Sequence, residues 1–163
     1  MLGVLMAAAA FTLTSPAFTS DGNIPTKYTC DAGAQNPSPA LAWKESPAGT
    51  KSFVLIMHDP DAPLAGGFTH WVLFDIPAST TGLPEAFQPG SIGVSGNSGF
   101  RRAGYGGPCP PSGEHHYHFM LSALDTPSLG LATGATKADV EKAMQGHVLG
   151  TTELVGLYQR QPR

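Results

Sequence analysis

Three histidines fall within four residues of this chain, at His115, His116 and His118. They follow directly on "YGGPCPPSG", a loop in which glycines allow bending and prolines restrict it. A metal site, a catalytic site and an anion-binding pocket would each use imidazoles of this kind. Such a loop either aims backbone N–H groups into a concavity that holds an anion, or is a tight connection without a ligand.

A strand expected over "HHYHFMLSALD" separates these histidines. Because side chains alternate between the two faces of a strand, His115 and Tyr117 share one face, and His116 and His118 share the other. The three imidazoles therefore cannot all serve one site, which argues against the simplest metal centre. The two widely separated cysteines and the scattered histidines match no structural zinc spacing. We expect the protein to need no metal and no other cofactor.

Acidic residues and a further histidine lie at the ends of two other apolar runs. Asp59 and Asp61 belong to "DPDAP", where carboxylates either cap backbone N–H groups in a rigid turn or lie at a pocket rim. His70, in "THW", is either a core histidine with satisfied hydrogen bonds or a pocket residue. A pocket role for His70 is favoured by its position at the start of a buried run, just after the loop glycines Gly66 and Gly67.

The chain lacks complete signatures of the common enzyme classes. "GVSGN", around Ser95, lacks the second glycine of a nucleophile elbow, and "GYGGPC" is an incomplete dinucleotide-binding loop. No serine or cysteine has a visible base partner, although Tyr117 and His70 are capable of acid–base chemistry. These residues favour a binding protein over an enzyme, and no residue is assigned a catalytic role.

Short apolar runs between turn sequences must position these groups. They indicate strands over 10–15, 51–59, 69–77, 115–125 and 152–160. The run at 51–59 is continuously apolar, as in a strand buried on both faces. Residues 136–146 are typical of a helix, with a capping-box pattern at Thr136 and Asp139 and a stop at Gly146. The pattern predicts a mainly β, largely antiparallel protein with one late helix.

Length and composition fit one domain, expected over residues 11–163. The 163 residues include 20 glycines and 15 prolines without a period, which favours a loop-rich β protein over a disordered chain. Charged residues make up 13%, the formal net charge is -3, and no cluster of lysine and arginine is long enough to follow a phosphate backbone. Nucleic acid is therefore not expected as a partner.

Residues 1–10 form an apolar segment that is too short to span a bilayer, which takes about 20 residues. The alanines at its end are typical of a cleaved export signal, although the usual basic first region is missing. We expect export to the periplasm or the exterior, and no transmembrane segment. The alternative is an apolar N-terminal arm on a cytoplasmic protein.

The order of the motifs resembles one known family. D-P-D-A-P, H-W, G-Y-x-G-P-x-P-P-x-G, H-x-Y-x-F and A-L-D follow one another as in the phosphatidylethanolamine-binding proteins. The resemblance is closest to their bacterial branch, the Raf kinase inhibitor-like proteins, and runs from Ser15 to Tyr158. It implies a large antiparallel sheet packed on a smaller one, with a C-terminal helix.

The resemblance also implies a small pocket for phosphate-like groups or phospholipid head groups. Carried over by motif, its residues are Asp59, Asp61, His70, Gly107, Pro108, Cys109, Pro110, Pro111, His115 and Tyr117. A carboxylate beside the pocket histidines would orient an imidazole and raise its pKa. His116 stands where the family usually has arginine, and "GNSGFRRAGY" departs from the family's spacing. His116 and His118 are expected to be structural or to face solvent.

Exported relatives of this kind place cysteines in the two contexts seen here. The resemblance therefore implies a disulfide between Cys30 and Cys109, the only two cysteines of the chain. Such a bond would pin the loop at the pocket. The alternative is two unrelated buried thiols.

Three functions follow as hypotheses. The leading one is a protein that binds a phospho-ligand, with modulation of an unidentified protein partner as a further implication of the family name. The second is a small phosphoester or acyl hydrolase that uses Asp59, His70 and His115. The third is a protease-inhibitor-type interaction module, in which the loops around Pro63 and Ser95 make the contacts.

Overall fold

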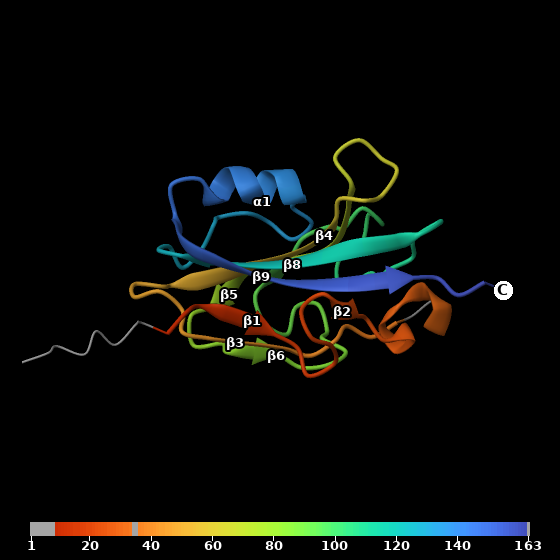
Figure 1. Ribbon diagram of the computed structural model, residues 1–163. Helices are drawn as coiled ribbons and strands as arrows, with labels where there is room; N and C mark the ends of the chain where they lie inside the picture. Colours follow the sequence, from red (N-terminus) through yellow and green to blue (C-terminus); the bar gives the residue numbers. More distant parts are fainter. Residues whose placement is uncertain (1–8, 34–35, 163) are drawn as a thin grey trace, which may run out of the picture.

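The computed structural model describes residues 9–33 and 36–162, which form two β-sheets and one α-helix (Figure 1). The strands are β1 (Thr12–Thr14), β2 (Gly22–Asn23), β3 (Leu41–Lys44), β4 (Ser52–Asp59), β5 (Phe68–Pro77), β6 (Gly82–Leu83), β7 (Val94–Ser95), β8 (Glu114–Leu124) and β9 (Val148–Gln159). The helix is α1 (Lys137–Met144), and two 3-10 turns, η1 (Thr26–Tyr28) and η2 (Cys30–Ala32), precede β3. The predicted mainly β class is confirmed.

The two sheets lie one on the other, with α1 on the outer side of the larger sheet (Figure 1). Within the described residues the larger sheet has the order β2-β9-β8-β4-β5-β7, and the smaller has the order β1-β3-β6. All pairings between these strands are antiparallel except the short parallel pairing of β2 with β9. The predicted arrangement of a large sheet on a smaller one is therefore confirmed as well.

The long strands coincide with the apolar runs of the sequence. β4, β5 and β8 begin and end within one residue of the predicted runs, whereas β9 begins at Val148, before its predicted start. The predicted helix is present and begins with the capping box of Thr136 and Asp139. The strands that the sequence did not predict are short, since β2, β6 and β7 have two residues each and β3 has four, and such lengths give a weak hydrophobic pattern.

Burial on both faces explains the continuous apolar run of β4. Phe53, Leu55 and Met57 pack in the core between the two sheets. Val54 and Ile56 point to the opposite face, where they pack in the cluster that contains the apolar side of α1. β4 is thus a central strand whose last residue, Asp59, is held in a fixed position.

The structure describes only the last two residues of the apolar N-terminal segment 1–10. Residues 1–8 lie outside the described residues, so the export signal stays a prediction. No helix in the described part of the chain is both long and apolar enough to cross a membrane.

Cys30 and Cys109 form a disulfide, as the family resemblance implied, with their Cα atoms 5.4 Å apart. The bond joins η2 to the loop that precedes β8. Next to it, the Cys30 backbone N–H donates to the Pro108 carbonyl oxygen at 3.0 Å. The Pro-rich loop is therefore tied both covalently and by a hydrogen bond to the N-terminal part of the described chain.

Replacing both cysteines by serine, Cys30→Ser with Cys109→Ser, should lower the free energy of unfolding by up to about 4–5 kcal/mol, because the bond closes a sequence separation of 79. Guanidinium denaturation followed by tryptophan fluorescence measures the change. Wild-type protein treated with a dithiol reductant should match the variant. An unchanged midpoint, or two alkylatable thiols in the unreduced protein, would contradict the prediction.

Candidate functional site

The candidate site lies where three neighbouring strands of the larger sheet meet. β4 is paired antiparallel with β5 on one side and with β8 on the other. The end of β4 at Asp59 therefore lies beside the beginning of β5 at Phe68 and near the beginning of β8. Antiparallel pairing thus brings together a carboxylate, imidazoles and a phenol that are far apart in the sequence.

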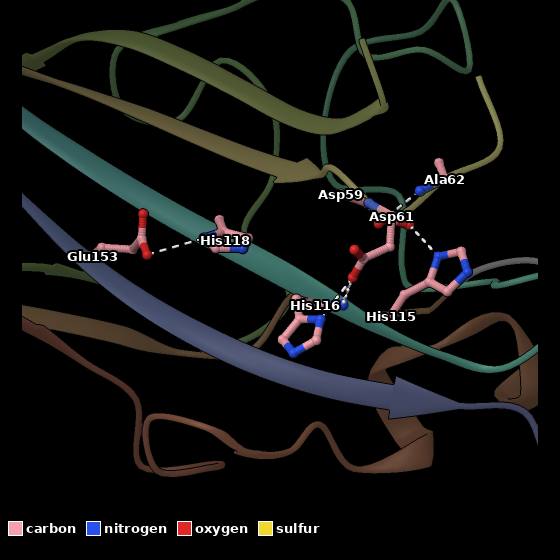
Figure 2. Close-up of polar contacts among 7 residues, drawn as sticks. All are labelled: Asp59, Asp61, Ala62, His115, His116, His118 and Glu153. Atoms are coloured by element: carbon pink, nitrogen blue, oxygen red, sulfur yellow. Dashed lines mark hydrogen bonds and ion pairs between the residues drawn. The ribbon is translucent and has the colours of Figure 1, made fainter. Parts of the chain in front are cut away.

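The buried carboxylate of Asp59 holds both a turn and a histidine. Its Oδ1 accepts hydrogen bonds from the backbone N–H groups of Asp61, at 2.8 Å, and Ala62, at 3.1 Å. Its Oδ2 accepts from Nδ1 of His115 at 2.7 Å, and both side chains are almost fully buried (Figure 2). The Asp59 carboxylate therefore caps the turn, which was one of the two readings of the sequence, and it also orients an imidazole, as the family resemblance implied.

The other two histidines of the cluster have carboxylate partners of their own (Figure 2). Oδ2 of Asp61 accepts from the backbone N–H and from Nδ1 of His116, at 2.8 and 2.7 Å, and these hydrogen bonds lower the pKa of Asp61. Nδ1 of His118 lies 2.9 Å from Oε1 of Glu153 on β9. Among the residues that the structure describes, no three potential metal ligands come together.

His70 is buried, and its ring packs edge-on against aromatic neighbours. Its Nδ1–H donates to the Gly106 carbonyl oxygen at 2.7 Å, and its ring centroid lies 5.0 Å from that of Phe68 and 5.2 Å from that of Tyr117. Burial lowers the pKa of His70, and it outweighs the opposing effects of the Gly106 hydrogen bond and of the Asp59 charge. The Asp59 carboxylate acts on the pKa of His70 in the expected direction, but desolvation is the larger effect, so the net pKa of His70 is lowered.

Tyr117 is fully buried, and its hydroxyl makes no hydrogen bond of acceptable geometry with any described residue. Burial raises the pKa of Tyr117 far above its ordinary value, and the Asp59 charge acts in the same direction. The phenol is therefore neutral and able to donate. A buried polar group without a partner costs roughly 1–3 kcal/mol, and a ligand oxygen at this position would recover that cost.

These groups face a cavity of about 310 Å³. The residues that line it are Asp59, Ala62, Pro63, Leu64, Phe68, His70, Phe100, Cys109, Pro110, Pro111 and Tyr117. Asp59, His70 and Tyr117 are buried and form its floor, whereas Leu64 and Phe100 are exposed and form its rim. The cavity has a polar floor and largely apolar walls.

The structure brings some of the predicted pocket residues to this cavity and leaves others out. The lining includes Asp59, His70, Cys109, Pro110, Pro111 and Tyr117, but it does not include Asp61, Gly107, Pro108 and His115. Asp61 is turned toward His116, and His115 contacts Asp59 without reaching the lining. His115 therefore acts on the cavity through Asp59.

The loop that was expected to present N–H groups to an anion uses most of them within the protein. The Gly107 N–H donates to Oδ1 of Asn36 at 2.8 Å, and the Gly106 N–H donates to the His70 carbonyl oxygen at 3.0 Å. The three prolines of the loop have no N–H. Within the described stretch 106–111, the Cys109 N–H donates to no backbone carbonyl, and it lies against the Tyr117 hydroxyl oxygen, where it lowers the pKa of Tyr117 in opposition to burial.

Sequence reasoning missed the apolar lining of the cavity. Phe68 could have been found, because it lies two residues before His70 and alternation places both on one face of β5. Leu64 and Phe100 belong to loops without periodicity, so no local signal indicates that they meet at one rim.

Comparison with known proteins agrees with the motif resemblance. The family model for phosphatidylethanolamine-binding protein matches residues 14–159. A UPF0098 protein of Methanothermobacter thermautotrophicus is 49% identical over 91% of this chain and 98% of that protein. The UPF0098 protein YbcL of Escherichia coli is 34% identical over 93% of this chain and 89% of that protein.

Solved structures show the same fold. The crystal structure of E. coli YbcL, described as a new member of the mammalian PEBP family, has a TM-score of 0.85 at 33% identity and covers 94% of this chain and 100% of its own. A PEBP homologue from Chlamydia trachomatis, CT736, also has a TM-score of 0.85, at 37% identity, and covers 93% of this chain and 99% of its own. The chain therefore belongs to the phosphatidylethanolamine-binding protein family.

Proposed function

We propose that this protein binds a small phosphate-like anion, either free or as the head group of a phospholipid, in the cavity beside Asp59, His70 and Tyr117. The observation that carries the proposal is the buried Tyr117 hydroxyl, which lines the cavity and has no partner among the described residues. The Cys109 N–H and the ring of His70 lie next to it. Membership of a family named for binding phosphatidylethanolamine supports the proposal.

The charge of Asp59 sets a condition on any anion bound here. Three hydrogen bonds from the protein stabilise this carboxylate, but its negative charge still opposes a second anion. Protonation of His70 on Nε2 supplies the balancing positive charge, since Nδ1–H is already donated to Gly106. Because burial lowers the pKa of His70, the free protein holds this ring neutral near pH 7 and takes up a proton when the anion binds.

Sulfate affinity should therefore fall as pH rises from about 5.5 to 8, by up to about tenfold per pH unit. The sign follows because only the protonated ring offers an Nε2–H to the anion, while sulfate itself keeps its charge over this range. Isothermal titration calorimetry in buffers of different ionisation enthalpy measures both the affinity and the proton uptake.

The control for this titration is a histidine outside the cavity. His70→Gln should weaken sulfate binding and flatten the pH profile. His147→Gln, at the exposed partner of Asp125, should change neither. A constant affinity over the range would exclude the protonation of His70, and the absence of any sulfate binding would exclude the proposed function itself.

Tyr117→Phe removes only the hydroxyl that has no hydrogen-bond partner in the described part of the chain. It should weaken sulfate binding roughly tenfold, the usual effect of losing one hydrogen bond to a charged group, and it should leave the free energy of unfolding unchanged or raise it. Calorimetry and denaturant unfolding measure the two effects.

The matched control is Tyr105→Phe, whose hydroxyl donates to the Tyr28 carbonyl oxygen at 2.7 Å. That change should cost about 1 kcal/mol of stability and leave sulfate binding intact. If Tyr117→Phe binds sulfate as well as the wild-type protein does, the phenol does not contact the ligand.

We further propose that the protein is not an enzyme. Cys109, which lines the cavity, is held in the disulfide, and Ser95 is buried on β7 and does not belong to the lining. We expect no turnover of p-nitrophenyl phosphate or p-nitrophenyl acetate. Turnover that His115→Ala abolishes would instead establish the hydrolase.

Export is proposed on the ground of the disulfide, because such bonds persist in oxidising compartments. The buried side chain of Ser95 does not support an exposed inhibitory loop at this position.

A further inference from the structure

A second cavity, of about 280 Å³, lies next to the first. Its lining consists of Cys30, Gly33, Asn36, Phe100, Arg102, Gly106, Gly107 and Cys109. The two cavities share Phe100 and Cys109, so the Phe100 ring and the disulfide form the boundary between them.

Phe100 is held at this boundary by its neighbours. Its ring centroid lies 4.8 Å from that of Phe68 and 5.6 Å from that of His70, both edge-on. It also lies directly on Gly106, where a Cβ atom would come within 2.3 Å of Cε2 of the ring. Because 42% of Phe100 remains exposed, the ring is a wall at the rim and not part of the core.

Arg102 places a positive charge on the far side of this wall. Its guanidinium carbon lies 5.6 Å from the Phe100 ring centroid, an arrangement that orients the guanidinium without neutralising it. No ion pair between Arg102 and any described residue is present. The guanidinium is thus preoriented and its charge is available.

A closed turn presents Phe100 and Arg102 together. The Ser98 N–H and hydroxyl both donate to the Arg102 carbonyl oxygen, at 3.0 and 3.1 Å, and the Phe100 N–H donates to the Ser98 hydroxyl at 3.2 Å. Gly99 N–H ties the same turn to the Thr69 carbonyl oxygen of β5 at 2.8 Å. The positions of the aromatic wall and of the cation are therefore coupled to the strand that carries His70.

From the floor of the first cavity to the second cavity, the lining changes through three chemical environments. The floor of the first is polar, its walls are apolar through Pro63, Leu64 and Phe68, and a single cationic side chain lines the second. Apolar walls give an inorganic ion nothing to contact, whereas they bury the methylene groups of an organic one. An unpaired guanidinium favours a carboxylate or phosphate, which it can bind through two parallel hydrogen bonds.

We propose that Arg102 forms a second anion subsite, and that the ligand of this protein is an organic anion with two negatively charged groups joined by a short apolar linker. The first group binds at the cavity floor, which rests on the proposed function. The linker passes between Leu64 and Phe100, and the second group pairs with Arg102.

Two series of phosphonates test this proposal by calorimetry. The first series carries a terminal carboxylate on linkers of one to six methylenes, and the second carries a methyl group at the same place. At one linker length or two, the carboxylate should raise affinity about tenfold over the matched methyl compound. Methylphosphonate, which reaches only the floor, reports separately on the proposed function.

A matched pair of variants assigns the gain to one residue. Arg102→Gln should remove the carboxylate gain and leave the affinity for methylphosphonate unchanged. Arg101→Gln removes the same charge from the neighbouring exposed residue, which belongs to neither lining, and should keep the gain.

The outcomes separate the two proposals. Binding of methylphosphonate without a carboxylate gain at any length overturns the Arg102 subsite and keeps the proposed function. An equal loss in Arg101→Gln and Arg102→Gln also overturns the subsite, because it shows only a general effect of charge. If no phosphonate binds, both proposals fail.

Discussion

The hydrogen bonds of the Asp59 carboxylate are the interaction on which the site depends. Asp59 is only 2% exposed, and a carboxylate buried to this depth needs hydrogen-bond partners that replace the water it has lost. Asp59 obtains these partners from two backbone N–H groups of the following turn and from His115 of β8. The same bonds join the end of β4 to the loop that supplies Pro63 and Leu64, so the shape of the cavity and the charge at its floor have one origin.

The site also shows how burial and charge compete at short range. The Asp59 charge favours protonation of His70, yet desolvation is larger and keeps the pKa of that ring below its ordinary value. Asp59 and burial act in the same direction on Tyr117, whose phenol stays protonated. The floor of the cavity therefore combines the Asp59 carboxylate with a neutral donor, the Tyr117 phenol, and with the His70 ring, which can gain a proton.

The Pro-rich loop is better described as a wall than as an anion-binding nest. Prolines have no N–H to offer, and the glycine N–H groups are donated to Asn36 and His70 within the protein. The disulfide fixes this wall from outside the sheet. Gly106 provides space and not flexibility. Only a residue without a side chain leaves room for the Phe100 ring that lies on it.

Much of this arrangement was determined by the sequence alone. Continuous and alternating apolar runs predicted β4, β5 and β8, and the same alternation placed His115 and Tyr117 on the face opposite His116 and His118. Hydrophobic periodicity is a local property, so a reader of the sequence can recover it. The ordered motifs likewise indicated the family, because each motif is a contiguous stretch of residues that can be read directly from the sequence.

Tertiary structure alone decided which of these residues reach the cavity and in which state. Asp61 carries the same chemical group as Asp59, but it meets His116 on the surface, and His115 reaches the cavity only through Asp59. Phe100 and Leu64 meet at one rim although no pattern links them. Depth of burial and the approach of distant loops arise from packing of the whole chain. Burial lowers the pKa of His70, and the packing of the described residues offers the Tyr117 hydroxyl no hydrogen-bond partner.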